Sequence, residues 1–170
     1  SGCHLNPAVT LGFYAARRLG GRMVVPYVIA QCAGALGASL VLRLMFPASA
    51  TLGVTEPSGG AMQSFVMEFL LTLILMFVIL RVSVEAKEKG LLAGVAIGAV
   101  IALEAMFAGP VSGASMNPAR SLAPALASLR LEHLWLYVAA PIAGAVASVA
   151  VCRCVQPSGC CGGVTEASCP

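Results

Sequence analysis

The sequence has no aspartate and only two histidines, and charged residues make up 10% of its 170 residues. A soluble domain carries about 25% charged residues, and a nucleic-acid-binding domain needs a dense basic surface that a net charge of +3 does not supply. Without aspartate, no Ser-His-Asp triad can form. We therefore predict no enzymatic activity, no metal or other cofactor, and no nucleic-acid partner.

Apolar residues, by contrast, make up 59% of the chain, and its mean hydropathy is +0.92. A helix needs about 20 apolar residues to cross a bilayer. Four stretches are long enough, at 23–46, 62–80, 91–108 and 134–152. Buried helices of a soluble protein are the alternative, but these stretches have almost no amphipathic face. The composition therefore predicts an all-α membrane protein in contact with lipid.

Two segments of the chain recur. SGCHLNPAVTL from Ser1 returns as SGASMNPARSL from Ser112, an offset of 111, and YVIAQCAGA from Tyr27 returns as YVAAPIAGA from Tyr137, an offset of 110. Two blocks at nearly one offset indicate a duplication. A long apolar stretch precedes the second copy and none precedes the first. We therefore expect that an N-terminal piece is missing and that the chain is a fragment.

The basic residues indicate how the spans are oriented, because Lys and Arg collect on the cytoplasmic side. Followed span by span, one side holds Arg17, Arg18, Arg22, Arg81, Lys87, Lys89 and Arg153, and the other holds Arg43, Arg120 and Arg130. The first Asn-Pro-Ala segment (residues 6–8; the second is 117–119) and the C-terminal tail are thus predicted to be cytoplasmic. Three spans separate the two Asn-Pro-Ala segments, so the second is inverted relative to the first. Such an inverted repeat builds a site near the bilayer midplane.

Each Asn-Pro-Ala segment has the signals of a helix start. Asn is a favoured N-cap, and Pro is tolerated at the first helical position. The runs after Asn6 and Asn117 are short, about ten residues or ~15 Å, which is half a membrane. Two such half-helices, entering from opposite faces, would bring N-termini of roughly +0.5 charge each to one point. This arrangement would repel cations while the Asn amides donate to a neutral solute, and it predicts a pore for small uncharged molecules.

Two Asn-Pro-Ala boxes on an inverted repeat, the second followed by Arg-Ser, resemble the aquaporin or major intrinsic protein family over residues 1–152. The resemblance implies an aquaporin-like inverted-repeat helical bundle with two re-entrant half-helices, assembled as a homotetramer. Six spans are typical, of which this chain would hold the last four. Residues 1–153 would form the channel domain and 154–170 a Cys-rich, disordered cytoplasmic tail. The pore residues implied are Asn6, Pro7, Ala8, Asn117, Pro118 and Ala119.

The resemblance also implies a constriction formed by Ala105, Ala114 and Arg120, with a fourth residue on the missing second span. Two alanines leave the ring wide, and Arg120 adds a positive field. The sequence from 107 to 122 is similar to the nodulin-like branch, which passes glycerol, urea and metalloid hydroxides as well as water. A strict water channel is the alternative, and both alanines could instead be packing residues. A coupled transporter is disfavoured, since the spans offer few titratable groups.

Three further residues are assigned supporting roles. Glu68 matches a glutamate with which the family holds the backbone of the second pore loop, and a carboxylate in a membrane interior is costly enough to suggest a function. His4 is expected at the cytoplasmic pore mouth or in simple packing, and Glu104 is expected to brace a loop.

Five of the seven cysteines lie in residues 152–170. Because a cytoplasmic tail is in a reducing compartment, disulfides are not expected there. The predicted location is the plasma membrane or an inner cell membrane.

Overall fold

The computed structural model describes residues 4–82 and 87–155, with the side chains of 87–91 excepted. Within these ranges the chain is helical and contains no strand. The helices are α1 (Pro7–Ala15), α2 (Gly21–Met45), α3 (Ala61–Val82), α4 (Lys87–Ser112), α5 (Pro118–Ser128) and α6 (Leu134–Val155). Four of them, with α4 counted from Leu92, are long and apolar enough to cross a membrane. The four predicted spans are therefore confirmed.

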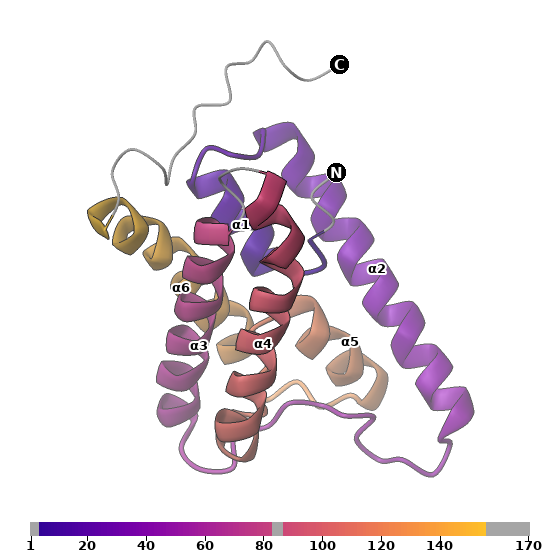
Figure 1. The fold of residues 1–170 in the computed structure, drawn as a ribbon. Coiled ribbons are helices and arrows are strands. Elements are labelled where there is room, and N and C mark those ends of the chain that lie inside the picture. Colours follow the sequence, from indigo (N-terminus) through magenta and orange to yellow (C-terminus); the bar gives the residue numbers. More distant parts are fainter. Residues whose placement is uncertain (1–3, 83–86, 156–170) are drawn as a thin grey trace.

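The two remaining helices are the predicted half-helices. α1 has 9 residues and α5 has 11, and each has Asn at its N-cap and Pro at its first turn. Asn6 and Asn117 both have extended backbone, with φ of −140° and −145°, which is the usual N-cap conformation. In Figure 1, α1 occupies the upper half of the bundle and α5 the lower half, between the long helices. An all-α bundle with two re-entrant half-helices is thus confirmed.

The helix pairing follows the internal repeat. α5 packs against α2, α1 packs against α6, and the most extensive contact joins α3 to α6. At Gly144 on α6 an added Cβ would overlap the backbone carbonyl oxygen of Phe69 and lie 3.1 Å from the Leu73 nitrogen on α3. Such close backbone approach through a small residue is typical of membrane helix packing. The repeat-equivalent Gly34 on α2 has nothing described within 4 Å.

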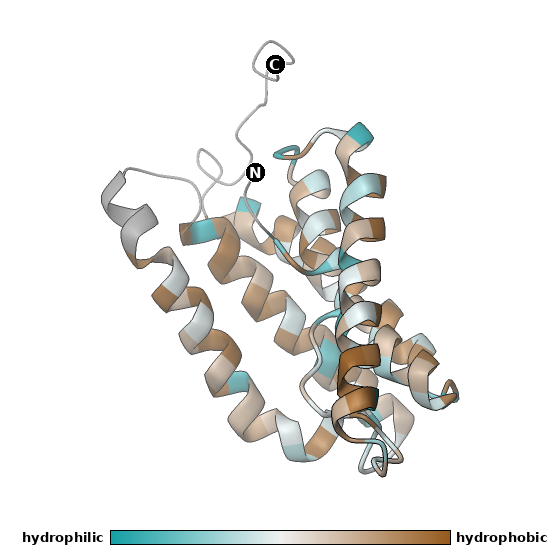
Figure 2. Ribbon diagram, turned by 90° about the vertical axis from the view of Figure 1, so that its right-hand side faces the viewer, coloured by the Kyte–Doolittle hydropathy of each residue, from teal (hydrophilic) through white to brown (hydrophobic). Residues whose placement is uncertain are grey.

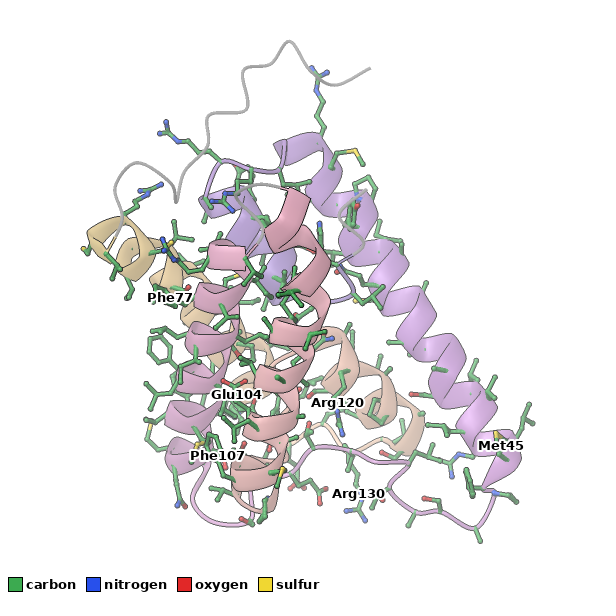
Figure 3. All side chains as sticks on the ribbon, viewed as in Figure 1. Met45, Phe77, Glu104, Phe107, Arg120 and Arg130 are labelled. Carbon is green, nitrogen blue, oxygen red and sulfur yellow. The ribbon has the colours of Figure 1, made fainter. Side chains whose placement is uncertain are left out.

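Apolar side chains occupy the periphery as well as the core. The core centres on α3, where Leu71, Met76 and Leu80 are at most 1% exposed. On the outer surface Met45 is 64% exposed and Phe107 is 53% exposed, and Figures 2 and 3 show apolar residues along the outside of the long helices. In water so large an apolar surface would be unfavourable. The molecule is an integral membrane protein.

One expectation about the cysteines is wrong. Cys152, buried at the end of α6, is disulfide-bonded, whereas Cys32 and Cys154 are free thiols. The expectation came from the redox state of a compartment, but pairing also depends on which sulfur atoms the fold brings together, and the sequence gives no signal for that proximity. The predicted tail lies mainly in 156–170, outside the described residues.

Candidate pore site

The tips of the two half-helices meet through a reciprocal pair of hydrogen bonds. Asn6 Nδ2 donates to the carbonyl oxygen of Met116 at 2.7 Å, and Asn117 Nδ2 donates to the carbonyl oxygen of Leu5 at 3.1 Å. Each acceptor is the residue directly before the Asn of the other repeat. The two copies of the duplicated segment therefore hold each other in a pseudo-symmetric contact between N-termini.

Each Asn side chain also caps its own helix. Asn6 Oδ1 accepts from the Ala8 amide at 2.9 Å, and Asn117 Oδ1 accepts from the Ala119 amide at 3.0 Å. The two assignments fix the amide orientation, because only the NH₂ group can donate to a carbonyl. An NH₂ group has two protons, and the cross-bond uses one. One N–H per Asn remains available to an oxygen atom at the tips.

Glu68 on α3 holds the loop that leads to the second tip. Its Oε1 accepts from the Ser112 hydroxyl and the Ser115 amide, both at 2.8 Å, and its Oε2 accepts from the Met116 amide at 2.7 Å. This loop is irregular, since Gly113, Ala114 and Met116 all have positive φ. Irregular backbone in a membrane protein must be satisfied by buried partners. Glu68 is fully buried and supplies them.

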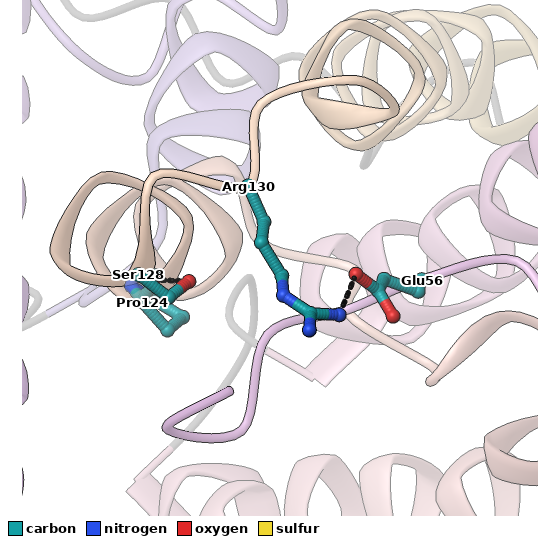
Figure 4. A network of polar contacts seen from close by, with 4 residues as sticks. All are labelled: Glu56, Pro124, Ser128 and Arg130. Carbon is teal, nitrogen blue, oxygen red and sulfur yellow. Dashed lines mark hydrogen bonds and ion pairs between the residues drawn. The ribbon is translucent and has the colours of Figure 1, made fainter. Parts of the chain in front are cut away.

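Arg120 in the first turn of α5 faces open space beside the tips. It is exposed, and its Nη1 donates to the carbonyl oxygen of Gly53 at 2.9 Å, which tethers the guanidinium to the α2–α3 linker. The same linker is bonded twice more near α5. The Thr55 hydroxyl donates to Ser121 at 2.7 Å, and Glu56 forms an ion pair with Arg130 at 3.0 Å, shown in Figure 4.

Two cavities adjoin the tips. One, of about 530 Å³, lies between α2 and α5 and is lined by Ala30, Gly34 and Ala38 among others. The other, of about 400 Å³, is bounded by α1, α3 and α4. Both are lined by Leu5, Asn117 and Arg120. The Asn tips and Arg120 thus stand where the two spaces adjoin.

The structure brings some of the predicted constriction residues to this place and leaves others away from it. Ala114 is 9% exposed and packs in the apolar core, and Ala105 is exposed on α4. Neither lines the two described cavities that Arg120 lines.

Glu104 is 2% exposed, and among the described residues neither of its carboxylate oxygens has a hydrogen-bond partner. The expected bracing bond from Glu104 is therefore not formed. Figure 3 shows Glu104 on α4 and Arg120 on α5.

His4 lies before the first tip and lines the second cavity. The Thr10 hydroxyl donates its one proton to the Asn6 carbonyl oxygen at 3.1 Å, so the 2.8 Å contact between His4 Nδ1 and Thr10 Oγ1 must be donated by His4. The neutral ring then carries an acceptor lone pair on Nε2. Burial lowers the pKa of His4, which favours this neutral form.

Gln31 is a site residue that the sequence did not identify. Its Nε2 donates to the carbonyl oxygen of His4 at 2.8 Å and to Thr10 Oγ1 at 2.9 Å. It therefore connects α2 to the first pore loop and lines the larger cavity. The available signal was an uncharged polar residue within an apolar span, a position where polar groups are costly.

The fold and this site together define the class of the molecule. It is an all-helical, multi-pass membrane protein in which two oppositely inserted half-helices meet at their N-termini beside an arginine.

The family follows from direct comparison. The Major intrinsic protein family model matches residues 1–152, and the chain belongs to that family, whose members are channels and not enzymes. Aquaporin NIP1-4 from Oryza sativa subsp. japonica is 53% identical over 148 residues, covering 86% of this chain and 54% of that protein. Nodulin-26 from Glycine max is 45% identical over 157 residues, covering 92% and 58%. The chain spans about half the length of these curated relatives.

A solved structure shares the fold. The aquaglyceroporin from Plasmodium falciparum superimposes with a TM-score of 0.78 at 23% identity, covering 92% of this chain and 74% of that one. The helical arrangement of this chain is therefore that of the solved aquaglyceroporin, and the family match confirms the resemblance predicted from the sequence.

Proposed function

We propose that this chain forms a passive transmembrane channel for water and small neutral solutes, such as glycerol, urea or metalloid hydroxides, and excludes ions and protons. The observation that carries the proposal is the reciprocal bonding of the two Asn side chains at the tips of α1 and α5. It fixes both amides and leaves one donor on each for a passing oxygen atom.

Exclusion of ions follows from the charges at the same place. Each half-helix N-terminus carries roughly +0.5 charge, and the Arg120 guanidinium adds a full positive charge beside them. A cation or hydronium ion would have to approach these charges with little water to screen them. A neutral solute pays no such penalty and can replace water at the Asn donors.

The proposed solute range rests on the resemblance to the nodulin-like branch of the family. The sequence is similar to Aquaporin NIP1-4 and Nodulin-26. We propose that Ala105 and Ala114 leave the constriction of the full-length channel wide, although neither lines the two cavities that Arg120 lines in this chain. A strict water channel is the alternative for the solute range. We further propose a homotetramer with one pore per subunit, in the plasma membrane or an inner cell membrane, with a channel domain at 1–153 and residues 154–170 in the cytoplasm.

Light scattering from proteoliposomes tests the proposal. Under a sucrose gradient we expect fast shrinkage, and under glycerol or urea gradients shrinkage followed by re-swelling as the solute enters. The flux should rise in proportion to the solute gradient. Flux that saturates or follows a pH gradient would indicate a coupled transporter, and shrinkage without re-swelling would indicate a strict water channel.

Arg120 gives a prediction on selectivity. Arg120→Val should raise proton or potassium leak by at least about tenfold, because one elementary charge a few ångströms from the path contributes more than about 1.4 kcal/mol at a protein-like dielectric constant. A pH-sensitive or potassium-sensitive dye inside proteoliposomes measures this leak. Arg120→Lys is the matched control, since it keeps the charge. An unchanged leak in Arg120→Val would show that Arg120 does not contribute to the exclusion of ions.

A further inference from the structure

Both half-helices end in the same turn, at the membrane faces far from the tips. Arg17 after α1 and Leu129 after α5 each have a left-handed backbone with φ of 58°. In each case the N–H of that residue and the N–H of the following residue donate to carbonyl oxygens in the last turn of the helix, which is the Schellman arrangement. The bonds are Arg17 N to Tyr14 O (2.9 Å), Arg18 N to Phe13 O (2.8 Å), Leu129 N to Leu126 O (3.4 Å) and Arg130 N to Ala125 O (2.9 Å).

Among the described residues, this turn leaves terminal carbonyls of each half-helix without a backbone partner. The last four carbonyl groups of a helix have no partner within it, and the Schellman bonds satisfy two of them. In α1 the Gly12 carbonyl accepts from the Ala16 amide at 2.9 Å, and in α5 the Pro124 carbonyl accepts from the Ser128 hydroxyl at 2.6 Å, as Figure 4 shows. Of the carbonyls left without a backbone partner, those of Ala15 and Ala127 hold the same place, each two residues before the left-handed position; in α5 the Ser128 carbonyl is also left.

An arginine reaches each of these equivalent carbonyls. Arg43 Nη2 on α2 donates to Ala127 O at 2.8 Å, while its Nη1 donates to Ser49 O at 3.1 Å. Arg153 Nη2 on α6 donates to Ala15 O at 3.4 Å. Arg43 and Arg153 are separated by 110 positions, the same offset that relates Tyr27 to Tyr137. Ala15 and Ala127 are 112 positions apart, so the acceptors correspond by their place in the terminal turn, and an equivalent contact occurs once in each half of the repeat.

We infer that Arg43 and Arg153 are a pair of positioning residues, each anchoring the membrane-face end of the half-helix that belongs to the other repeat. A guanidinium at a helix C-terminus faces the roughly −0.5 charge of the helix dipole as well as the unpaired carbonyl. Helices as short as α1 and α5 are marginal alone and need fixing by tertiary contacts. The Asn cross-bonds fix one end and the arginine fixes the other, so the half-helix cannot slide along its axis.

The distribution of basic residues favours this reading over a simple interfacial anchor. In the predicted orientation Arg43 lies on the non-cytoplasmic side, where the positive-inside rule gives no reason for a basic residue. It is nonetheless half-buried and donates two hydrogen bonds to backbone carbonyls. The positioning role rests on the proposed channel function, because it matters through the placement of the pore tips.

Hydrogen exchange on the full chain in proteoliposomes, read by mass spectrometry, tests the inference. Arg43→Met should raise exchange in peptides covering 118–130 by about tenfold, the change expected when a charge-assisted hydrogen bond is lost, and leave 61–82 unchanged. Arg153→Met should raise exchange in 7–18, with a smaller change because its bond is longer. Arg43→Lys keeps the cation and one donor and should restore most of the protection. Arg22→Met, at the exposed start of α2, is the control and should change neither region.

Three results would overturn the inference: no change in 118–130, a uniform rise that includes 61–82, or Arg43→Lys behaving like Arg43→Met. Glycerol flux measured on the same vesicles should fall in both Met variants at unchanged protein content. If the exchange pattern appears as expected but the unaltered protein passes no solute, the anchoring stands and the proposed function fails. The two ideas are therefore separable in one preparation.

Discussion

Gly144→Ala is expected to destabilise the bundle by about 3 kcal/mol or more. A Cβ at this position would overlap the carbonyl oxygen of Phe69 and press on the backbone of Leu73. Overpacking usually costs about 1–3 kcal/mol when side chains can move aside, and here the obstacle is helix backbone. Only separation of α3 from α6 would relieve the overlap, and that is the most extensive helix contact in the molecule.

Thermal unfolding of the purified protein in detergent, followed by loss of helical circular dichroism, measures this effect. Gly98→Ala is the matched control, because nothing described lies within 4 Å of its added Cβ and a Gly-to-Ala change within a helix is otherwise favourable. A midpoint for Gly144→Ala equal to that of the control would show that α3 and α6 are less closely packed than the structure has them.

The sequence was sufficient for the features that have local signals. Apolar runs of bilayer length predicted the four long helices, and Asn-Pro pairs followed by short runs predicted α1 and α5. These signals work because the N-cap chemistry of Asn6 and Asn117 is decided within three residues. The duplication then predicted the inverted topology, because its two copies are separated by an odd number of spans.

Contacts between distant segments had no such signal. That Asn6 bonds the carbonyl of Met116, or that Arg43 reaches Ala127, depends on how helices pack, and backbone carbonyls are the same in every residue. The likeness of Arg43 and Arg153 was present in the sequence as an offset of 110, but only the structure gives it a physical meaning. For the same reason, the exposure of Ala105 on α4 and the pairing of Cys152 could not be predicted.

Glu68→Gln is expected to reduce both stability and solute flux. Both carboxylate oxygens of Glu68 accept hydrogen bonds, so an amide nitrogen at either position would face a donor. One of the Ser115 or Met116 amides would then lose its only described side-chain acceptor. Leaving a buried donor unpaired costs about 1–3 kcal/mol, and more when a charged partner is lost. We expect a loss of about 3 kcal/mol.

The loss of flux has a separate reason. Met116 both donates its amide to Glu68 and accepts the Asn6 cross-bond at its carbonyl oxygen, so a shift of this one residue displaces the contact between the tips. We therefore expect glycerol flux per folded molecule to fall even at temperatures where Glu68→Gln remains folded. Glu132→Gln is the control, because Glu132 is an exposed residue in the α5–α6 connection. Normal flux from folded Glu68→Gln would mean that the tips are held together without the buried carboxylate.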